Sequence, residues 1–406
     1  MVETNHVQLD DELWERINAL TDGAAAVCFQ CGECTAVCPW GLVREGALNV
    51  RSMMRQAQLG IKSWEDDLWL CSSCAQCEAY CPRAVDIADV FRALRGISWQ
   101  ERTVEPGLPS MLWSMYWNEN PWSQPPSQRF SWAKDLEVPI FDPQRHEAAL
   151  YVGCTASYDR RVQRVAAALV RVLGSCGAKF GCLGDREPCC GEPVKSVGHN
   201  PYFEEVVHSS ARVFREMGVQ KLVTISPHCY DVFKNDYPEV LGGGFIETVH
   251  YTQYLSELIH HGQLDLTPGV LNGEIKEGIG KQLREMVEVT FQDPCYLGRS
   301  NGEYAAPRYV LGALPGMVLL EMEDKEVDGL CCGGGGGRMW LETPPGERFA
   351  DLRVQQAADT GASILATACP FCLVCLEDSL KAAGDLDMRV LDVAEIVWKS
   401  MEDNFE

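Results

Sequence analysis

Leu330-Cys-Cys-Gly-Gly-Gly-Gly-Gly-Arg-Met-Trp340 is the stretch around which the rest of the chain is organised. Two adjacent thiols cannot both serve one ordinary tetrahedral metal site without strain, and five glycines leave no Cβ atoms to keep a bulky ligand away from the backbone. Cys295 lies upstream of this stretch, and Cys369 and Cys372 lie downstream. The alternative, a buried apolar Cys-Cys pair followed by a flexible loop, leaves the flanking cysteines unexplained. We therefore expect five sulfurs to meet at one large ligand.

The composition bounds the class of protein. With 406 residues, of which 46% are hydrophobic, the chain can bury two or three cores. Its 20 cysteines stand at metal-ligand spacing, and no basic and apolar signal region begins the sequence, so we expect a reduced, cytoplasmic protein. The net charge of −23 argues against a nucleic-acid partner. No apolar run approaches the ~20 residues that cross a bilayer, so attachment to the cytoplasmic membrane face would require a partner or a surface patch.

A four-cysteine motif occurs twice within the first hundred residues. Each copy reads Cys-x-x-Cys-x-x-Cys-x-x-x-Cys-Pro. A cubane [4Fe-4S] cluster needs four thiolates, and this spacing lets one loop supply three while the cysteine before proline crosses to the other cluster. The predicted ligands are Cys28, Cys31, Cys34 and Cys81 for one cluster, and Cys71, Cys74, Cys77 and Cys38 for the other.

Zinc in two four-cysteine sites is the structural alternative, but zinc ribbons rarely use this spacing followed by proline. An acidic helix is expected over Asp10 to Leu20, and the insert from Gly41 to Leu70 has helical periodicity. The module resembles the helical ferredoxin domain of respiratory iron–sulfur subunits. Two clusters side by side would conduct electrons without any substrate chemistry of their own.

Residues 101–147 are rich in proline and tryptophan. The prolines predict no regular element, and the many aromatic residues argue against a flexible linker. The segment could strap the ferredoxin module onto the rest of the chain, or it could present its aromatic side chains to a partner subunit. We favour the strap, because buried aromatic side chains are the commoner case.

The remainder of the chain contains a repeat of about 142 residues. In this repeat Cys154 corresponds to Cys295, Cys189-Cys190 to Cys331-Cys332, and Cys229 to Cys372. The expected strands lie at 148–153, 221–225, 287–292 and 363–367, and the expected helices after the two Cys-Cys-Gly motifs lie at 202–217 and 346–360. This alternation predicts two small parallel α/β domains related by pseudo-twofold symmetry. Ligands bind at the carboxyl ends of such strands, where these cysteines stand.

The two halves differ at one important position. Ser226 stands where the second half has Cys369, so the first half has four of the five sulfurs. Cys154, Cys189, Cys190 and Cys229 could hold a different cluster, leave a site open for substrate, or hold nothing. His228 could be a further ligand, although a histidine before a helix is more often a capping or hydrogen-bonding group. We interpret Cys375 as a spare thiol, and Cys176 and Cys182 as core residues.

The predicted domain boundaries follow from these motifs. The whole chain is expected to combine a helical ferredoxin domain with two α/β Cys-Cys-Gly domains. The segments are 1–100 for the ferredoxin domain, 101–147 for the linker, 148–285 for the first Cys-Cys-Gly domain and 286–406 for the second.

These motifs resemble those of the heterodisulfide reductase family of iron–sulfur proteins, in the single-chain arrangement of its D-type subunits. The similarity covers the chain from about Ala24 to Met401. It rests on Cys28 to Pro39, Cys71 to Pro82, Pro188-Cys-Cys-Gly191, Leu330-Cys-Cys-Gly333 and Cys369-Pro-Phe-Cys372.

The resemblance implies a noncubane [4Fe-4S] cluster in a complete Cys-Cys-Gly domain. The residues that match its five ligands, and that would form the catalytic site, are Cys295, Cys331, Cys332, Cys369 and Cys372. In the disulfide reductases two such clusters are thought to cleave one disulfide, each taking a sulfur, and Ser226 departs from that pattern. The segment Asn120 to Pro126 is similar to one in bacterial relatives that work beside electron-transfer flavoproteins or membrane quinone partners.

Four functions follow as hypotheses. The preferred one is an oxidoreductase subunit that relays electrons between a flavoprotein and a quinone, a thiol or disulfide, or a low-potential acceptor, in acyl-CoA or other anaerobic metabolism. Partner subunits are expected, because the chain has no Gly-x-Gly-x-x-Gly dinucleotide motif. The alternatives are a catalytic disulfide reductase subunit acting at the noncubane cluster, or the iron–sulfur subunit of a glycolate or lactate oxidase. A redox-silent structural module is a third class.

Overall fold

The chain divides into two compact units in a computed structural model that describes residues 9–44, 46–65, 67–266, 270–271, 274–275, 286–344, 346–384 and 386–402. Unit 1 consists of Met1–Ser110, Pro193–Tyr202 and Gly333–Phe349, and unit 2 of Met111–Glu192, Phe203–Cys332 and Ala350–Glu406. The segments that directly follow both Cys-Cys-Gly motifs therefore belong to unit 1. The predicted domain limits at residues 1, 285 and 406 lie outside the described residues.

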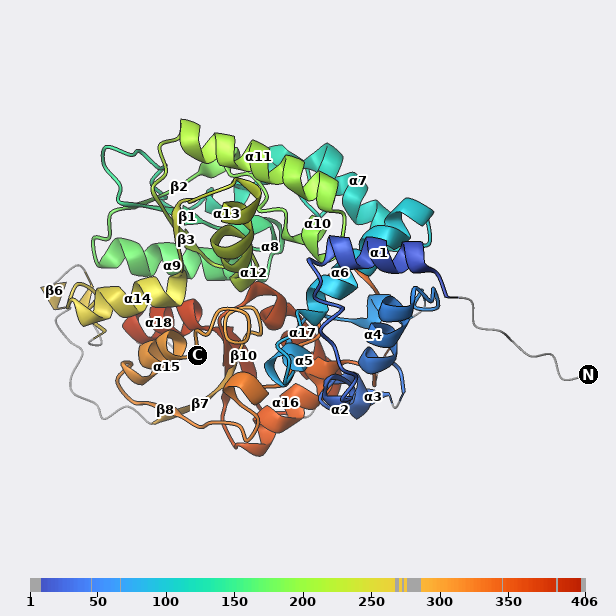
Figure 1. The fold of residues 1–406 in the computed structure, drawn as a ribbon. Helices are drawn as coiled ribbons and strands as arrows, with labels where there is room; N and C mark the ends of the chain where they lie inside the picture. The colour runs from blue at the N-terminus through green and yellow to red at the C-terminus, as the bar shows by residue number, and fades with distance from the viewer. Residues whose placement is uncertain are drawn as a thin grey trace, which may run out of the picture. The chain divides into compact units, whose positions relative to one another are not determined.

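Unit 1 is built from helices (Figure 1). They are α1 (Asp11–Leu20), α2 (Glu33–Ala36), α3 (Trp40–Val43), α4 (Val50–Leu59), α5 (Gln76–Ala79), α6 (Ile87–Glu101) and the beginning of α7 (Leu108–Asn118), with α10 (Glu192–Ser196) starting at the unit boundary. Helix α1 begins as predicted, because the Asp10 side chain accepts a hydrogen bond from the Leu13 amide. Helix α4 ends at Leu59 and is capped by Gly60, which adopts a left-handed conformation and lies too close to the backbone of Asp10 to carry a Cβ.

Unit 2 contains two four-stranded sheets in which every pairing between neighbours is parallel. The first has the order β2-β1-β3-β4 and the second the order β8-β7-β9-β10, so corresponding strands occupy corresponding places. Their bounds are β1 Ala148–Tyr151, β2 Phe180–Cys182, β3 Lys221–Thr224, β4 Glu247–His250, β7 Val287–Gln292, β8 Met317–Leu319, β9 Ile364–Thr367 and β10 Arg389–Asp392. A small antiparallel pair, β5 (Val270–Leu271) with β6 (Glu274–Ile275), was not predicted.

Helices cover both faces of these sheets, as α9 and α11 do for β1 to β3 (Figure 1). Central strands β1 and β9 are buried along their whole length, which explains why the sequence shows them as continuous apolar runs. The helices are α8 Gly153–Tyr158, α9 Gln163–Ser175, α11 Asn200–Glu216, α12 Pro227–Asp231, α13 Tyr237–Val240, α14 Tyr251–His260, α15 Ala305–Gly312, α16 Phe349–Asp359, α17 Pro370–Ala383 and α18 Val393–Glu402.

The two halves of unit 2 pack through equivalent helices. Helix α9 contacts α18, and α15 contacts α14. Helices α9 and α15 are equivalent because each follows the first strand of its half, and α14 and α18 are equivalent because each follows the last. The contact of α9 with α18 therefore corresponds to the contact of α15 with α14, as a twofold axis requires. Arg161 strengthens this packing with hydrogen bonds of 2.8 and 3.0 Å to the two carboxylate oxygens of Glu395. The predicted pseudo-twofold pair of parallel α/β domains is confirmed.

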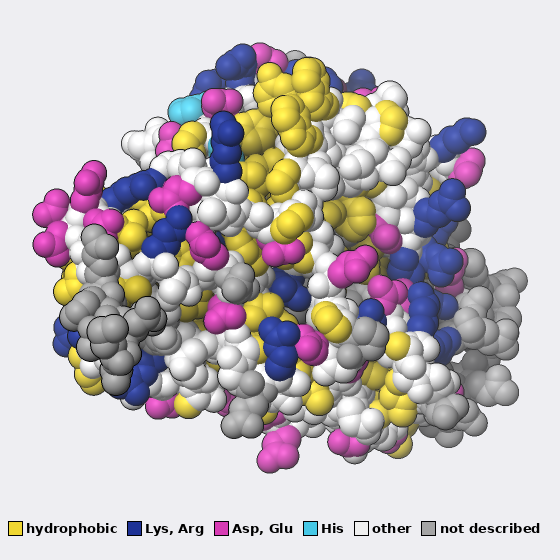
Figure 2. Space-filling view, turned by 90° about the vertical axis from the view of Figure 1, so that its right-hand side faces the viewer, with side chains coloured by type: hydrophobic (Ala, Val, Ile, Leu, Met, Phe, Trp, Pro, Cys, Tyr) yellow, Lys and Arg dark blue, Asp and Glu magenta, His cyan; other side chains and the backbone are white. Residues whose placement is uncertain are grey.

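The linker differs from its prediction. Residues 108–118 form helix α7 although the sequence was expected to contain no regular element. Pro109 is tolerated because it stands in the first turn, where its missing N–H has no partner to lose. Trp113, Tyr116 and Trp117 of this helix are 62%, 60% and 69% exposed, so the strap hypothesis is wrong for these three side chains. Figure 2 draws one face of the protein, on which hydrophobic side chains gather in the upper part.

Candidate functional site: four groups of cysteines

The two cysteine loops of unit 1 have the same backbone shape. Gln30 and Gly32 in the first loop, and Ser73 and Ala75 in the second, all have positive φ angles, between 50° and 95°. They stand two and four residues after the first cysteine of each loop, and the second of each pair directly precedes a short helix, α2 or α5. Three of the four are not glycine and adopt a conformation that side chains disfavour. This repeated cost indicates loops shaped around a ligand.

The four cysteines predicted for one cubane line a single cavity. They are Cys38, Cys71, Cys74 and Cys77, and the cavity also contacts Phe91 and Phe349. Burial raises the pKa of Cys38 to about 12, and the neighbouring Cys74 and Cys71 contribute to the rise. Burial likewise raises the pKa of Cys71 and of Cys77. Four thiols that line one cavity, with Cys74 buried and the other three half-buried, fit a cubane cluster, whose iron supplies the positive charge that four thiolates need.

The other predicted set lies nearer the surface. Burial, followed by repulsion from Cys28 and also from Cys31, raises the pKa of Cys34 to about 11, so these three thiols are neighbours. Gln58 of α4 fixes their loop by donating to the carbonyl oxygens of Ala25 and Cys28 at 3.0 and 2.7 Å. The place of Cys81 as the fourth ligand stays a prediction. In the described part of the chain, no group of three or more His, Cys, Asp or Glu side chains surrounds a position for a single metal ion.

Arg95 joins the loop of one cubane to the segments that follow both Cys-Cys-Gly motifs. It lies on α6, is fully buried, and donates hydrogen bonds to four backbone carbonyls. The acceptors are Leu68 at 3.1 Å, Cys71 at 2.6 Å, Ser196 at 2.6 Å and Gly336 at 3.0 Å. All five residues belong to unit 1. Arg95 was not predicted as a functional residue, although its place on the apolar stripe of α6, beside Phe91 and Leu94, marked it as unusual.

The glycine at position 336 was expected to make room for a bulky ligand, but it makes room for the protein backbone instead. A Cβ atom at this position would clash with the Cys71 carbonyl oxygen and lie 2.9 Å from the Ser72 carbonyl carbon. The glycine run thus lets the chain approach the backbone of a cubane loop. Arg338 adds a hydrogen bond of 3.3 Å to the Trp69 carbonyl, just before the same loop.

The second half of unit 2 brings together all five cysteines predicted for the noncubane cluster. The sulfurs of Cys295 and Cys331 lie 3.9 Å apart. Cys372 is hydrogen-bonded to Cys332 and to Cys369. All five side chains are buried. Cys369 precedes α17 and Pro370 occupies the first turn of that helix, so the helix begins at the carboxyl end of β9, where the topology predicted the ligands.

His228 from the first half reaches the site of the second half. Its imidazole stacks on Tyr296, with ring centroids 3.9 Å apart, and contacts Phe371 at 4.6 Å. Its Nδ1 lies 3.2 Å from a carboxylate oxygen of Glu192. Burial opposes protonation, but Glu192 and Cys369 outweigh it and raise the pKa of His228. The pKa of Cys369 is lowered despite its burial, because Cys372 and His228 hydrogen-bond to its sulfur. His228 and Phe371 are equivalent by the pseudo-symmetry, so they meet near its axis.

The first half retains four clustered thiols. Cys190 donates a hydrogen bond of 3.3 Å to the sulfur of Cys229, and Cys154 is hydrogen-bonded to Cys189. Ser226 is buried and precedes α12, as Cys369 precedes α17. Arg129, which was not predicted as a functional residue, donates to the Cys154 sulfur at 3.5 Å. No periodic pattern marks Arg129, because it lies in an irregular segment.

Glu187 balances the charge of Arg129. Their ion pair is 3.1 Å long, and both side chains are at least nine-tenths buried. Burial opposes the charge on Arg129, but Cys154 and Glu187 outweigh it and raise the pKa of this guanidinium.

Three cysteines belong to none of the four groups. Cys182 is buried in β2 as predicted, Cys375 is half-buried, and Cys176 is half-buried rather than a core residue.

Comparison with known proteins identifies two kinds of domain in this chain. Residues 148–234 and 289–377 match the family described as cysteine-rich domain (CCG), and residues 24–85 match the 4Fe-4S dicluster domain. The D-type subunit of dihydromethanophenazine:CoB–CoM heterodisulfide reductase from Methanosarcina barkeri is 28% identical over 407 residues, covering 92% of this chain and 93% of that one. This chain is a homologue of the D-type subunits of heterodisulfide reductase.

Two longer bacterial proteins are also similar. EtfAB:quinone oxidoreductase of Syntrophomonas wolfei is 34% identical over 89% of this chain and 50% of its own. The protein named "Probable iron-sulfur-binding oxidoreductase FadF" of Bacillus subtilis is 33% identical over 83% and 47% respectively. The chain thus spans about half the length of these relatives. Within the described residues, none of the helices combines the length and apolar character needed to span a bilayer.

Proposed function

We propose that this chain is the electron-transfer subunit of an oxidoreductase complex. Two cubane clusters would be held by the cysteines of unit 1, and a noncubane cluster by Cys295, Cys331, Cys332, Cys369 and Cys372. The bound clusters would accept and release single electrons. The outer partners are a flavoprotein on one side and a quinone, thiol or disulfide, or low-potential acceptor on the other. The relatives support a redox role, since they are iron–sulfur oxidoreductase subunits.

The observation that carries this proposal is the contact between Gly336 and the Cys71 loop. Cys71 is a predicted cubane ligand, and Cys332, only four residues before Gly336, is a predicted noncubane ligand. Four residues span at most about 14 Å when fully extended, so Cys332 lies within about that distance of Gly336. Arg95 fixes the contact by binding the carbonyl oxygens of Cys71 and Gly336 together. A chain built in this way favours electron transfer between the two sites.

A Cys38→Ser variant tests the proposal. Cys38 is the ligand that crosses from the first motif to the cavity of the second, and its loss should remove that cubane alone. We expect the iron content of the purified, anaerobic chain to fall by about four atoms. Reduction of the second Cys-Cys-Gly site by a donor acting at the first cubane should then become much slower. A variant that loses no iron, or that reduces this site as fast as the wild type, would contradict the proposal.

Catalytic disulfide reduction is the second candidate. The contact of His228 with Phe371 supports it, because these equivalent residues bring the two Cys-Cys-Gly sites of unit 2 to the pseudo-twofold axis. Paired cleavage of a disulfide would need a cluster in both halves. An iron count on the loaded chain separates the candidates. About 12 iron atoms mean that the half with Ser226 holds no cluster and favour the relay, whereas about 16 favour paired chemistry.

A further inference from the structure

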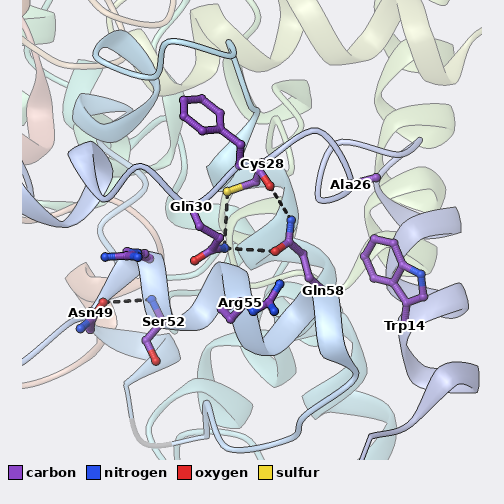
Figure 3. A pocket seen from close by; sticks show the side chains of 10 residues that line it. Trp14, Ala26, Cys28, Gln30, Asn49, Ser52, Arg55 and Gln58 are labelled. Carbon is purple, nitrogen blue, oxygen red and sulfur yellow. Dashed lines mark hydrogen bonds between the residues drawn. The ribbon is translucent and has the colours of Figure 1, made fainter.

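An open cavity lies beside Cys28 in unit 1 (Figure 3). Its volume is about 890 Å³, and its wall includes Trp14 of α1, Cys28 and Phe29 of the first cysteine loop, and Arg51, Arg55 and Gln58 of α4. Gln58 points toward Cys28 and fixes its loop to α4 through the carbonyl bonds of 3.0 and 2.7 Å described above. One wall of the cavity is therefore the edge of a predicted cubane site.

Arg51 lies directly over the cluster loop. Its Nη1 and Cδ atoms lie 3.7 and 3.5 Å from the position that a Cβ of Gly32 would occupy. Gly32 follows Cys31, which is exposed to solvent. The Arg51 side chain thus lies beside the residue that directly follows the exposed Cys31.

The cavity differs in charge from the rest of the chain. None of the ten described residues that line it is acidic, and two of them are arginines, whereas the net charge of the chain is −23. Both arginines are exposed, one turn apart on α4. Phe29 lines the same cavity and is 59% exposed, and Val27, two residues before it in the chain, is 45% exposed. Arginine beside aromatic and apolar surface is typical of protein interfaces.

Building on the proposed relay, we propose that this cavity is the docking site of an electron-transfer protein that presents carboxylates around its own cofactor. The two arginines would attract and orient that acidic surface, and Phe29 and Val27 would be covered by it. A small anion would need only the guanidinium groups and would leave both apolar side chains exposed. Docking here brings the partner's cofactor to the Cys28 edge of the first cubane, where a single electron passes between the two proteins.

The test uses the full chain loaded with clusters. A small acidic [2Fe-2S] ferredoxin, reduced beforehand, serves as the protein probe, and reduced methyl viologen serves as a small probe that needs no docking. Reduction of the cubanes is followed by stopped-flow absorbance at low and high salt. The double variant Arg51→Glu/Arg55→Glu changes the net charge by about −4. The matched control, Arg164→Glu/Arg212→Glu, makes the same change at exposed positions on α9 and α11 of unit 2.

The double variant should lower the second-order rate with ferredoxin about 10- to 100-fold at low salt and remove its decrease with added salt. The control should change that rate by less than about threefold, and viologen should reduce every variant at the wild-type rate. Equal losses in both variants, an unchanged rate in the Arg51 and Arg55 variant, or a wild-type reaction without salt dependence would overturn the proposal. So would tight binding of inorganic pyrophosphate that depends on these arginines while ferredoxin rates do not.

Failure of the docking site is distinguishable from failure of the relay. The docking test measures only the reduction of the cubanes by the probe. A relay that fails would leave this rate sensitive to Arg51 and Arg55 and would show itself later, as a second Cys-Cys-Gly site that never accepts electrons from the reduced cubanes.

Discussion

Replacing Arg95 should loosen the segment that follows the second Cys-Cys-Gly motif. The guanidinium binds four carbonyl oxygens through two nitrogens, at 2.6 to 3.1 Å. A lysine has one nitrogen and cannot span this set, so Arg95→Lys should lose at least two of the bonds. Hydrogen bonds from a charged donor are each worth about 1.5 to 3 kcal/mol, which gives a loss of about 3 kcal/mol or more.

Hydrogen exchange measures this loss locally. The amides of Arg338 and Met339 donate to the carbonyls of Gly335 and Gly334 at 3.0 and 3.2 Å, so they report on the segment. About 3 kcal/mol corresponds to a fall of about 100-fold in their protection against exchange. A peptide covering residues 333–342 isolates these amides by mass spectrometry.

Arg353→Lys is the matched control. Arg353 is also fully buried, but it belongs to unit 2 and binds Gln292 and the Asp324 carbonyl at 2.5 and 2.8 Å. It should lower protection around residue 324 and leave residues 333–342 unchanged. Unchanged exchange in Arg95→Lys, or the same loss at 333–342 in Arg353→Lys, would refute the role assigned to Arg95.

Further predictions concern single residues. Gly336→Ala should destabilise unit 1 by about 2 to 4 kcal/mol in chemical denaturation, because the added Cβ would meet the Cys71 loop. In the control Gly346→Ala, the residue also has a positive φ but lies in open space, so the loss should be only about 1 to 2 kcal/mol. Equal losses in the two variants would contradict the close approach of Gly336 to the Cys71 loop. His228→Phe keeps an aromatic ring stacked on Tyr296 but removes a hydrogen bond to the Cys369 sulfur. The reduction potential of the second Cys-Cys-Gly site should therefore fall by up to about 100 mV, as measured by an EPR titration. An unchanged potential would show that His228 does not act on that sulfur. Burial lowers the pKa of His250 to about 3 from its ordinary 6.5. Between pH 3 and pH 6.5 this imidazole is therefore protonated in the unfolded chain but not in the folded one. Acidification through this range should destabilise the fold by about 1.4 kcal/mol per pH unit. Burial raises the pKa of Asp392 to about 8, so this carboxyl group has the opposite effect on stability in the same pH range. The measurement is therefore the difference in unfolding free energy between wild type and His250→Asn, taken at pH 7 and at pH 5. A difference that does not change with pH would disprove the lowered pKa of His250.

Local signals in the sequence predicted most of the fold. Strand β7 was predicted at 287–292 and lies at Val287–Gln292, where apolar Val287, Val289 and Phe291 alternate with polar residues at the period of a strand. The repeat of the cysteines predicted two equivalent sheets, since a duplicated sequence conserves strand order as well as ligands. Helix α7 was missed because prolines were counted without regard to their place in the first turn.

Contacts between residues far apart in the chain could not be predicted from the sequence. Arg95 and Arg129 are buried charges whose partners are carbonyls and carboxylates far away in the chain, and no periodicity reports such partners. The glycine at position 336 was visible, but its reason, the backbone of the Cys71 loop, depends on how the chain returns to unit 1. The five sulfurs of the second half were expected together, whereas the approach of His228 from the first half was not expected.

The most direct test of the relay is the order in which the sites become reduced. The oxidised, fully loaded chain is mixed with one equivalent of reduced ferredoxin, and samples are frozen at intervals for EPR. The account predicts that a cubane signal appears first and decays as the signal of the second Cys-Cys-Gly site grows, and that Cys38→Ser blocks the second phase. Growth of that second signal without a preceding cubane signal, at the same rate in Cys38→Ser, would contradict it.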